Sequence, residues 1–255
     1  MRILVTNDDG IDSPGLHMLA RIALEASDDV LVAAPHTERS GASASLTVLG
    51  DGGRLPVHTG AAQVPGLDPM RTLAVEATPA FITMVAANGA FGPPPQVVLS
   101  GINRGPNTGH AILHSGTVGA ALTAATYGYR ALAVSVAAAT PRHWGTACEV
   151  AARALDWLLH HTPDASVLNV NVPDLPADHL RGLRPARLAS YGAVQGTVGE
   201  PGEGHVTMTF TPLTTTGEPG TDAALLAEGW ATITALRSPC EARGVPLPGV
   251  AGEIH

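Results

Sequence analysis

The sequence contains no lysine: all 14 basic side chains among its 255 residues are arginine. This absence excludes mechanisms that need a lysine amine, including the Walker A phosphate loop, the pyridoxal Schiff base and the lysine of the kinases. A chain of this composition that binds phosphate must therefore use a metal ion, backbone amides or arginine in place of an ammonium group.

Other features are scarce as well. Cys148 and Cys240 are the only cysteines, too few for a disulfide framework, so we expect a reducing, cytoplasmic location. The net charge of −8 and the lack of a basic stripe argue against duplex nucleic acid or an anionic membrane as the main partner. No apolar stretch approaches the length of about 20 residues needed to span a bilayer, and the first residues predict a strand rather than a signal peptide.

Short apolar runs alternate with longer alanine-rich stretches along most of the chain. Alternation of this kind predicts a Rossmann-like, three-layer α/β fold with a doubly wound, mostly parallel sheet. The runs are typical of buried strands, and the longer stretches have helical spacing. The expected strands are 2–6, 30–34, 96–100, 131–136 and 167–172, and the expected helices are 15–26, 79–88, 117–127 and 146–161.

Two regions depart from this alternation. Residues 50–69 are rich in glycine and proline with a weak strand at 54–58, which indicates a surface insertion or a hairpin. From about Arg181 the pattern predicts a protruding β-hairpin arm over 181–212. The arm's expected strands are 183–190 and 206–211, joined by the glycine-rich stretch 196–204; a helix at 222–228, a strand at 230–236 and a Pro/Gly-rich tail follow. We therefore expect a catalytic core over 1–180 with an appendage over 181–255.

Two adjacent carboxylates, Asp8 and Asp9, follow the first predicted strand. Ligands of an open parallel sheet bind outside the carboxyl ends of its strands, so these acids lie where a site is expected. Like charges side by side raise each other's pKa unless a cation neutralises them, which favours a hard divalent metal ion. Ser40 and Asn103 follow later strands and add oxygen donors, which suit Mg²⁺, Mn²⁺ or Ca²⁺ better than zinc.

A second loop, Ser115-Gly116-Thr117, precedes an alanine-rich helix and offers free backbone N–H groups and two hydroxyls to an anion. Each motif alone has a simpler interpretation. The acids also fit an Asx turn in which Asp12 or Ser13 caps the next helix, and Ser115 also fits a plain N-cap. A metal site on one loop and an anion site on another together indicate phosphoryl chemistry.

The chain resembles the SurE survival proteins, a family of metal-dependent 5′/3′-nucleotidases. The resemblance rests on motifs that occur in the family's order over nearly the whole chain. They are MRILVTNDDGIDSPG at 1–15, VLVAAPHTERSGASASLT at 30–47, VVLSGINRGPNTG and HSGTVGAA within 97–121, ALAVS at 131–135, LNVNVPDLP at 168–176 and PGTDAALLAEGWATITAL at 219–236.

The resemblance implies hydrolysis of a phosphomonoester with one divalent ion per subunit, Mg²⁺ or Mn²⁺, with Ca²⁺ able to occupy the site in a crystal. The implied metal ligands are Asp8, Asp9, Ser40 and Asn103, and the implied phosphate-binding residues are Asn107, Ser115, Gly116 and Thr117. Asp8 and Asp9 are the catalytic candidates, with Asp8 as general base or as nucleophile.

Three further residues are candidates for the site. Asn7 directly precedes the acids. His114 is a candidate for the leaving-group acid or for phosphate contact, against a packing or solvent role. Arg104 is expected to pair with an acid of a neighbouring loop rather than with phosphate.

Departures from the family pattern bear on substrate and assembly. Phe81 stands where the family has an acid, Thr123 where it has glutamate and His114 where it has tyrosine. The alternatives to a nucleotidase are therefore a phosphatase for a non-nucleotide small ester and a non-catalytic member that binds a nucleotide or a metal. The expected partners are a small phosphorylated substrate and a second copy, as a homodimer through the 181–212 arm. A Pro/Gly-rich tail stands where the family has a terminal helix, so we do not expect that helix here and have little reason to expect a tetramer.

Overall fold

The computed structural model describes residues 1–47, 51–190, 194–202, 205–212 and 218–239. Its centre is a nine-stranded sheet in which six neighbouring strands, from β4 to β7, run parallel. β3 at one edge runs antiparallel to β4, and β11 and β8 at the other edge run opposite to β7. In spatial order the strands are β3 (Val57–Thr59), β4 (Thr72–Val75), β2 (Asp29–Pro35), β1 (Arg2–Thr6), β5 (Val97–Arg104), β6 (Arg130–Val136), β7 (Val167–Val172), β11 (Ala231–Leu236) and β8 (Leu183–Pro185).

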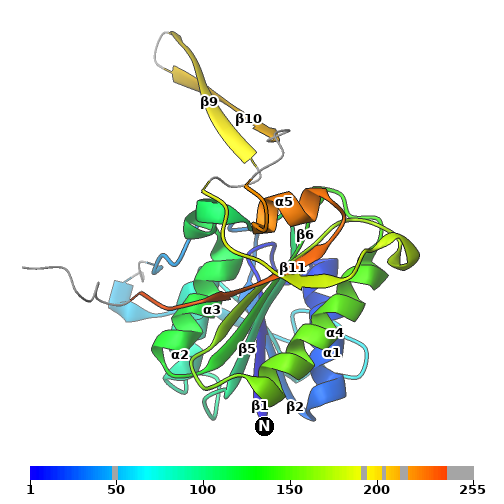
Figure 1. The fold of residues 1–255 in the computed structure, drawn as a ribbon. Coiled ribbons are helices and arrows are strands. Elements are labelled where there is room, and N and C mark those ends of the chain that lie inside the picture. Colours follow the sequence, from blue (N-terminus) through cyan, green and yellow to red (C-terminus); the bar gives the residue numbers. More distant parts are fainter. Residues whose placement is uncertain (48–50, 191–193, 203–204, 213–217, 240–255) are drawn as a thin grey trace, which may run out of the picture.

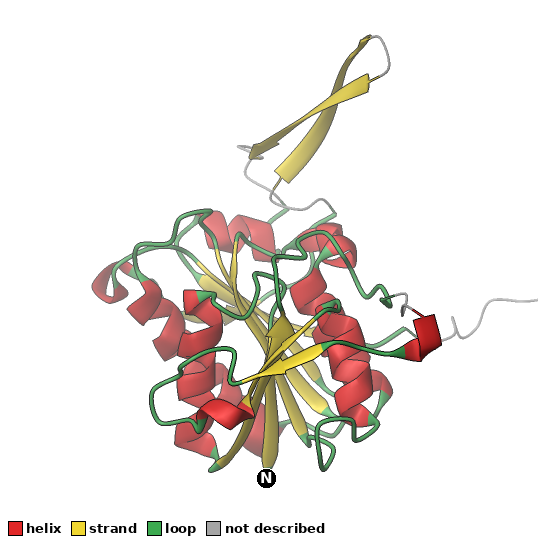
Figure 2. Cartoon of the chain, turned by 180° about the vertical axis from the view of Figure 1, so that it is seen from behind, coloured by secondary structure: helices red, strands yellow, loops and turns green. Residues whose placement is uncertain are grey.

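Helices cover both faces of the sheet, which gives the three layers visible in Figures 1 and 2. α1 (Pro14–Ala26) and α4 (Trp144–His161) pack on one face, and α2 (Pro79–Ala87) and α3 (Gly116–Thr126) on the other. In β1, Ile3 and Val5 pack in the core on the α1 and α4 face, and Leu4 packs in the core on the α2 and α3 face. A strand buried on both faces reads as one continuous apolar run, and the predicted α/β fold is confirmed.

The order of the strands fixes where a ligand can bind. From β1 the chain builds the sheet outward through β2 and β4, and then returns to the other side of β1 with β5. The loops after β1 and β5 therefore diverge, and the carboxyl ends of these strands are the usual ligand position in doubly wound sheets. Among the described helices, none is long and apolar enough to cross a membrane.

The core elements agree closely with the sequence prediction. The four predicted helices are confirmed, with ends that differ by no more than two residues. β5 is longer than expected, because the chain passes Gly101 with a shift in register and continues pairing with β6 at Asn103 and Arg104. β4 was not predicted, because its four residues, Thr72–Val75, form only a short run between the charged side chains of Arg71 and Glu76.

The segment 50–69 is only partly a surface feature. Its strand is β3, three residues long and shifted from the predicted 54–58, and it forms an antiparallel hairpin with β4. Ala62, Val64 and Leu67 are buried in the core beneath α1. The hairpin interpretation is therefore confirmed, whereas the description as a surface insertion is wrong for these three residues.

The arm begins later than predicted. Leu183–Pro185 is β8 and pairs in parallel with β11, so the prediction of an arm strand over 183–190 is wrong. The arm's strands are β9 (Val194–Gly202) and β10 (His205–Pro212), a separate antiparallel pair beyond the sheet (Figure 1). The glycine-rich stretch belongs mostly to β9, because glycine weakens a strand without forbidding it.

The chain beyond residue 180 therefore contributes both to the arm and to the main sheet. α5 (Asp222–Ala227) and β11 confirm the predicted short helix and final strand, and β8 and β11 complete the main sheet beside β7. The division into a core over 1–180 and an appendage over 181–255 stays a prediction. The Pro/Gly-rich tail from residue 240 onward lies outside the described residues.

Candidate functional site

Asp8 and Asp9 follow the carboxyl end of β1, where a ligand site was expected. Asp8 is 4% exposed and the side chain of Asp9 3% exposed. The two carboxylates contact different elements: Asp8 Oδ1 accepts a hydrogen bond from the Thr117 hydroxyl on α3. Asp9 Oδ2 accepts from the Arg104 backbone N–H at 3.3 Å, and its Oδ1 lies 3.4 Å from the Arg104 guanidinium. The acid pair thus connects β5 with α3.

Burial perturbs both acids in the same direction. Burial raises the pKa of Asp8 above its usual value; the hydrogen bond from Thr117 opposes this, and the charge of Asp9 adds to it. Burial also raises the pKa of Asp9, against the opposing charge and hydrogen bonds of Arg104 and with a smaller contribution from Glu38. Two buried acids with raised pKa values form a position at which a bound cation favours the ionised state.

The loop after β2 approaches the acids through its backbone. The Arg39 N–H donates to the Asp8 carbonyl at 2.7 Å. Ser40 is exposed and its hydroxyl donates to Glu38 Oε1 at 2.8 Å, while Glu38 Oε2 lies 3.7 Å from Arg104. The structure therefore joins Ser40 to the acid pair through Glu38 and Arg104, without a direct contact. The predicted pairing of Arg104 with neighbouring acids is confirmed.

The donor atoms at this position fit a hard divalent cation. Asn103, near the end of β5, donates through Nδ2 to the Gly105 carbonyl at 2.7 Å. Asn7, directly before the acids, donates to the Gly10 carbonyl, and its buried Oδ1 has no hydrogen-bond partner among the described residues. Carboxylate, amide and hydroxyl oxygens are the ligands of Mg²⁺ and Mn²⁺. The described residues contain no group of three His, Cys, Asp or Glu side chains suited to a metal.

The N-terminus of α3 lies against Asp8. Ser115 Oγ accepts from the Val118 N–H at 3.1 Å, so the capping interpretation of Ser115 is confirmed. Gly116 lies so close to Asp8 that a Cβ at this position would be 2.8 Å from Asp8 Oδ2 and 2.9 Å from Asp8 Cβ. Backbone N–H groups at the start of a helix attract anions, and the acids opposite attract cations. A phosphate group with its metal ion satisfies both.

Asn107 lies in the loop between β5 and α3 and is held by residues that the sequence did not single out. Its Nδ2 donates to Ser135 Oγ at 2.8 Å, and its backbone contacts Asn169 and Asn171 of β7. Two residues further on, the Gly109 N–H donates to the buried Asp222 at 2.8 Å. The signal in the sequence was the pair of asparagines at alternate positions of the otherwise apolar run VLNVNV.

The remaining candidates lie at the margin of the site or outside it. His114 is the exposed last residue of the 3-10 helix Gly109–His114. Ser13 occupies the N-cap position of α1, but its side chain makes no capping hydrogen bond, so the acids do not belong to a side-chain cap of that helix. Phe81 is buried in the core between α2 and the sheet, and the Thr123 hydroxyl donates to the Gly119 carbonyl within α3.

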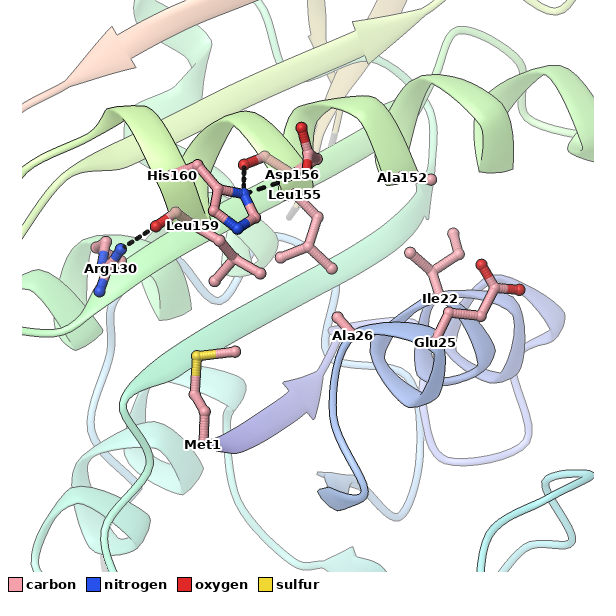
Figure 3. A pocket seen from close by; sticks show the side chains of 10 residues that line it. All are labelled: Met1, Ile22, Glu25, Ala26, Arg130, Ala152, Leu155, Asp156, Leu159 and His160. Carbon is pink, nitrogen blue, oxygen red and sulfur yellow. Dashed lines mark hydrogen bonds and ion pairs between the residues drawn. The ribbon is translucent and has the colours of Figure 1, made fainter.

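A cavity of about 480 Å³ lies at the opposite end of the sheet, between the C-terminal halves of α1 and α4 (Figure 3). Met1, Leu155 and Leu159 contribute to its apolar lining. The rim carries Arg130, which donates to the Leu159 carbonyl, and His160, which pairs with Asp156. The five residues of β1 separate this cavity from the acid pair, about 16 Å at the rise of an extended strand.

Comparison with known proteins agrees with this geometry. The family model described as Survival protein SurE matches residues 3–193. A 5′-nucleotidase SurE from Aeromonas hydrophila is 36% identical over 246 residues, which cover 92% of this chain and 92% of the relative. A 5′/3′-nucleotidase SurE from Shigella dysenteriae is 37% identical over 242 residues, covering 93% and 90%. The crystal structure of the SurE protein from Aquifex aeolicus superposes with a TM-score of 0.77 at 27% identity, covering 94% of this chain and 95% of that one. The chain therefore belongs to the SurE family.

Proposed function

We propose that this chain is a metal-dependent phosphomonoesterase that hydrolyses nucleoside 5′- and 3′-monophosphates to nucleoside and phosphate. The observation that carries the proposal is the adjacent pair Asp8 and Asp9, whose side chains are buried, with Asp8 in contact with Thr117 at the N-terminus of α3. Cation-binding oxygens and anion-binding amides lie side by side, which is the requirement for holding a metal–phosphate pair. The nucleotidase names of the full-length relatives supply the substrate class.

The oxygen atoms of Asp8, Asp9, Ser40 and Asn103 would hold one Mg²⁺ or Mn²⁺ per chain, and Ca²⁺ fits the same donors. When bound, a divalent ion withdraws charge from the phosphoryl group and lowers the pKa of a coordinated water. Ser40 reaches this set by releasing the hydrogen bond to Glu38, which its exposed position allows.

Protein residues would supply phosphate binding, the general base and the proton donor. Ser115 would bind the phosphate oxygens through its hydroxyl, Gly116 and Thr117 through their backbone N–H groups, and Asn107 through its side-chain amide. Asp8 acts as general base and accepts the proton of the attacking water, and the Thr117 hydroxyl fixes the orientation of its carboxylate. His114, on the exposed rim, is our candidate for donating a proton to the departing oxygen.

The alternative role for Asp8 is as a nucleophile, and the two roles predict opposite stereochemistry at phosphorus. One in-line displacement by water inverts a chiral phosphate, whereas two displacements through an acyl phosphate retain its configuration. We expect inversion when a phosphorothioate ester made chiral with two oxygen isotopes is hydrolysed in water of the third isotope, and retention would assign Asp8 as the nucleophile.

The direct test is hydrolysis of p-nitrophenyl phosphate, AMP and 3′-AMP with Mn²⁺ or Mg²⁺, with and without EDTA. Activity should appear only with metal. Asp8→Asn should abolish turnover, because it removes the charge and the proton acceptor. Asp12→Asn is the matched control, since Asp12 is an exposed acid four residues further along the same loop. Metal-independent release, or a near-normal rate for Asp8→Asn, would refute the proposal.

Two rival interpretations are tested in the same experiment. The substitutions at Phe81 and Thr123 suggested a non-nucleotide ester as substrate, but both side chains are engaged in packing or hydrogen bonding around α2 and α3. A panel with sugar phosphates and short polyphosphates discriminates between the substrate classes. A non-catalytic member would show metal-dependent thermal stabilisation by AMP without any release of phosphate.

We also propose a homodimer that forms through the arm predicted at 181–212, whose strands are β9 and β10. Two strands alone are marginally stable in water, so a hairpin that stands apart from the body gains from packing on a second copy. Light scattering at micromolar concentration should give twice the chain's 25.9 kDa. A monomeric mass would contradict the dimer.

A further inference from the structure

The backbone N–H and the backbone carbonyl of Asn107 both form hydrogen bonds with side chains of β7. Asn171 Oδ1 accepts from the Asn107 N–H at 2.7 Å, and Asn171 Nδ2 donates to the Asn107 carbonyl at 2.9 Å. Asn169 Nδ2 donates to the same carbonyl at 2.9 Å. Three hydrogen bonds from a rigid buried strand therefore fix one residue of an otherwise irregular loop.

These asparagines stand where a parallel strand normally has apolar residues. Both are 0% exposed, and their neighbours Val170 and Val172 belong to the core beneath α1 and α4. By strand alternation the two amides face the opposite side of the sheet. A buried amide lowers stability unless its polar atoms are bonded, and the Oδ1 of Asn169 has no partner among the described residues. Packing alone therefore does not account for the choice of asparagine.

The side chain of Asn107 is fixed together with its backbone. Its Nδ2 donates to Ser135 Oγ on β6, and Ser135 is the register partner of Asn171 across the β6–β7 pair. An asparagine amide has two donor hydrogens and one acceptor oxygen. One donor is used by Ser135, so one N–H and the oxygen remain for a ligand, in an orientation that neighbouring strands determine.

We propose that Asn171, supported by Asn169, is a positioning residue for phosphate binding: it holds the Asn107 peptide so that the Asn107 amide meets the phosphate group without rearrangement. This inference rests on the proposed function, in which Asn107 binds phosphate. Neither β7 asparagine touches substrate. The same loop is held two residues later by the Gly109–Asp222 hydrogen bond, so its binding conformation exists before the ligand arrives.

The test compares Asn171→Ala with Val170→Ala. Val170 lies in the same strand as Asn171 and is equally buried, but it packs in the core beneath α1 and α4. Its truncation therefore lowers stability without disturbing Asn107. For each protein we would measure kcat and KM with AMP, the inhibition constant of inorganic phosphate, and the Mn²⁺ concentration giving half-maximal activity. Asn169→Ala, which removes one of the three bonds, provides a graded second variant.

Asn171→Ala should raise KM and the phosphate inhibition constant together by about tenfold, the effect of one weakened hydrogen bond to a charged group. The Mn²⁺ requirement should stay within about twofold, because the acid pair is untouched. Asn169→Ala should shift the same two constants less, and Val170→Ala should leave both unchanged. If Asn171→Ala does not fold, Asn169→Ala against Val170→Ala decides by the same criteria.

The inference would be overturned if KM and the phosphate inhibition constant of Asn171→Ala equalled those of Val170→Ala. It would also be overturned if the Mn²⁺ requirement of Asn171→Ala rose as much as these constants, because the whole site would then be disturbed. A wild-type chain that neither hydrolyses AMP nor binds phosphate would instead overturn the proposed function, and the inference with it. The two failures are distinguished by the wild-type measurement alone.

Discussion

Gly116→Ala tests the closest contact in the site. The new Cβ would lie 2.8 Å from Asp8 Oδ2 and 3.1 Å from Asp8 Cγ. Non-bonded carbon and oxygen atoms relax to about 3.4 Å, so the carboxylate must retreat by about 0.6 Å. Displacement of a catalytic group by 1 Å lowers the rate by about 100-fold, so we expect kcat/KM to fall by about 10- to 100-fold.

Folding should survive this substitution. Alanine in a helix gains about 0.5–1 kcal/mol over glycine, and the steric strain costs about 1–3 kcal/mol, which leaves a net loss of about 1 kcal/mol. Gly145→Ala is the matched control: Gly145 also lies in the first turn of a helix, and nothing lies within 4 Å of an added Cβ. It should stabilise the protein and leave kcat/KM unchanged. Steady-state kinetics and thermal melts of both variants provide the measurements. A folded Gly116→Ala variant with kcat/KM within twofold of wild type would refute the argument that this contact holds Asp8 in place.

Two further predictions concern pH. Because burial raises the pKa of Asp8 and Asp9, protons compete with the cation at higher pH than they do for ordinary carboxylates. The Mn²⁺ concentration for half-maximal activity should therefore rise as the pH falls from 8 to 5, and a constant value over that range would contradict the expectation. Asp174 accepts hydrogen bonds from the backbone N–H groups of Arg142 and His143 at the start of α4. Burial acts to raise the pKa of Asp174, but these donors outweigh it and the pKa is lowered. The stabilisation by Asp174 is present above the ordinary pKa of a carboxyl and is lost as the pH falls through the lowered value. Asp174→Ala should unfold with about 1–2 kcal/mol less stability at pH 7 in urea titrations, with a smaller deficit at pH 3, and equal deficits at both pH values would argue against the capping role.

The position of the acid pair could be predicted from the sequence because the rule that locates it is local. Asp8 and Asp9 follow directly on an apolar run, and the end of a buried parallel strand is the ligand-binding edge whatever the rest of the sheet does. The pairing of Arg104 with acids was predictable for a similar reason, since the carboxyl ends of β1, β2 and β5 lie at the same edge of the sheet.

The supports of the site could not be predicted in the same way. Asp222 contacts Gly109 across 113 positions of the chain, and no local pattern reports a contact of that range. Asn171 is visible as an anomaly in an apolar strand, but its partner depends on the register between β6 and β7. β8 was assigned to the arm because residues 183–190 have the alternating pattern of a strand, and only the pairing with β11 shows that Leu183–Pro185 belongs to the main sheet.

The site has a buried half and an exposed half, and this division affects how the enzyme can change during evolution. Asp8 and Gly116 are so closely packed that a substitution at either disturbs the other. Leu113 and His114, which directly precede α3, are exposed on the rim, where most substitutions have small effects on folding. Selection for a new leaving group therefore has most of its freedom on the rim, while the phosphoryl-transfer groups stay constant. A mutant library confined to rim positions should yield altered substrate preference with the metal requirement intact.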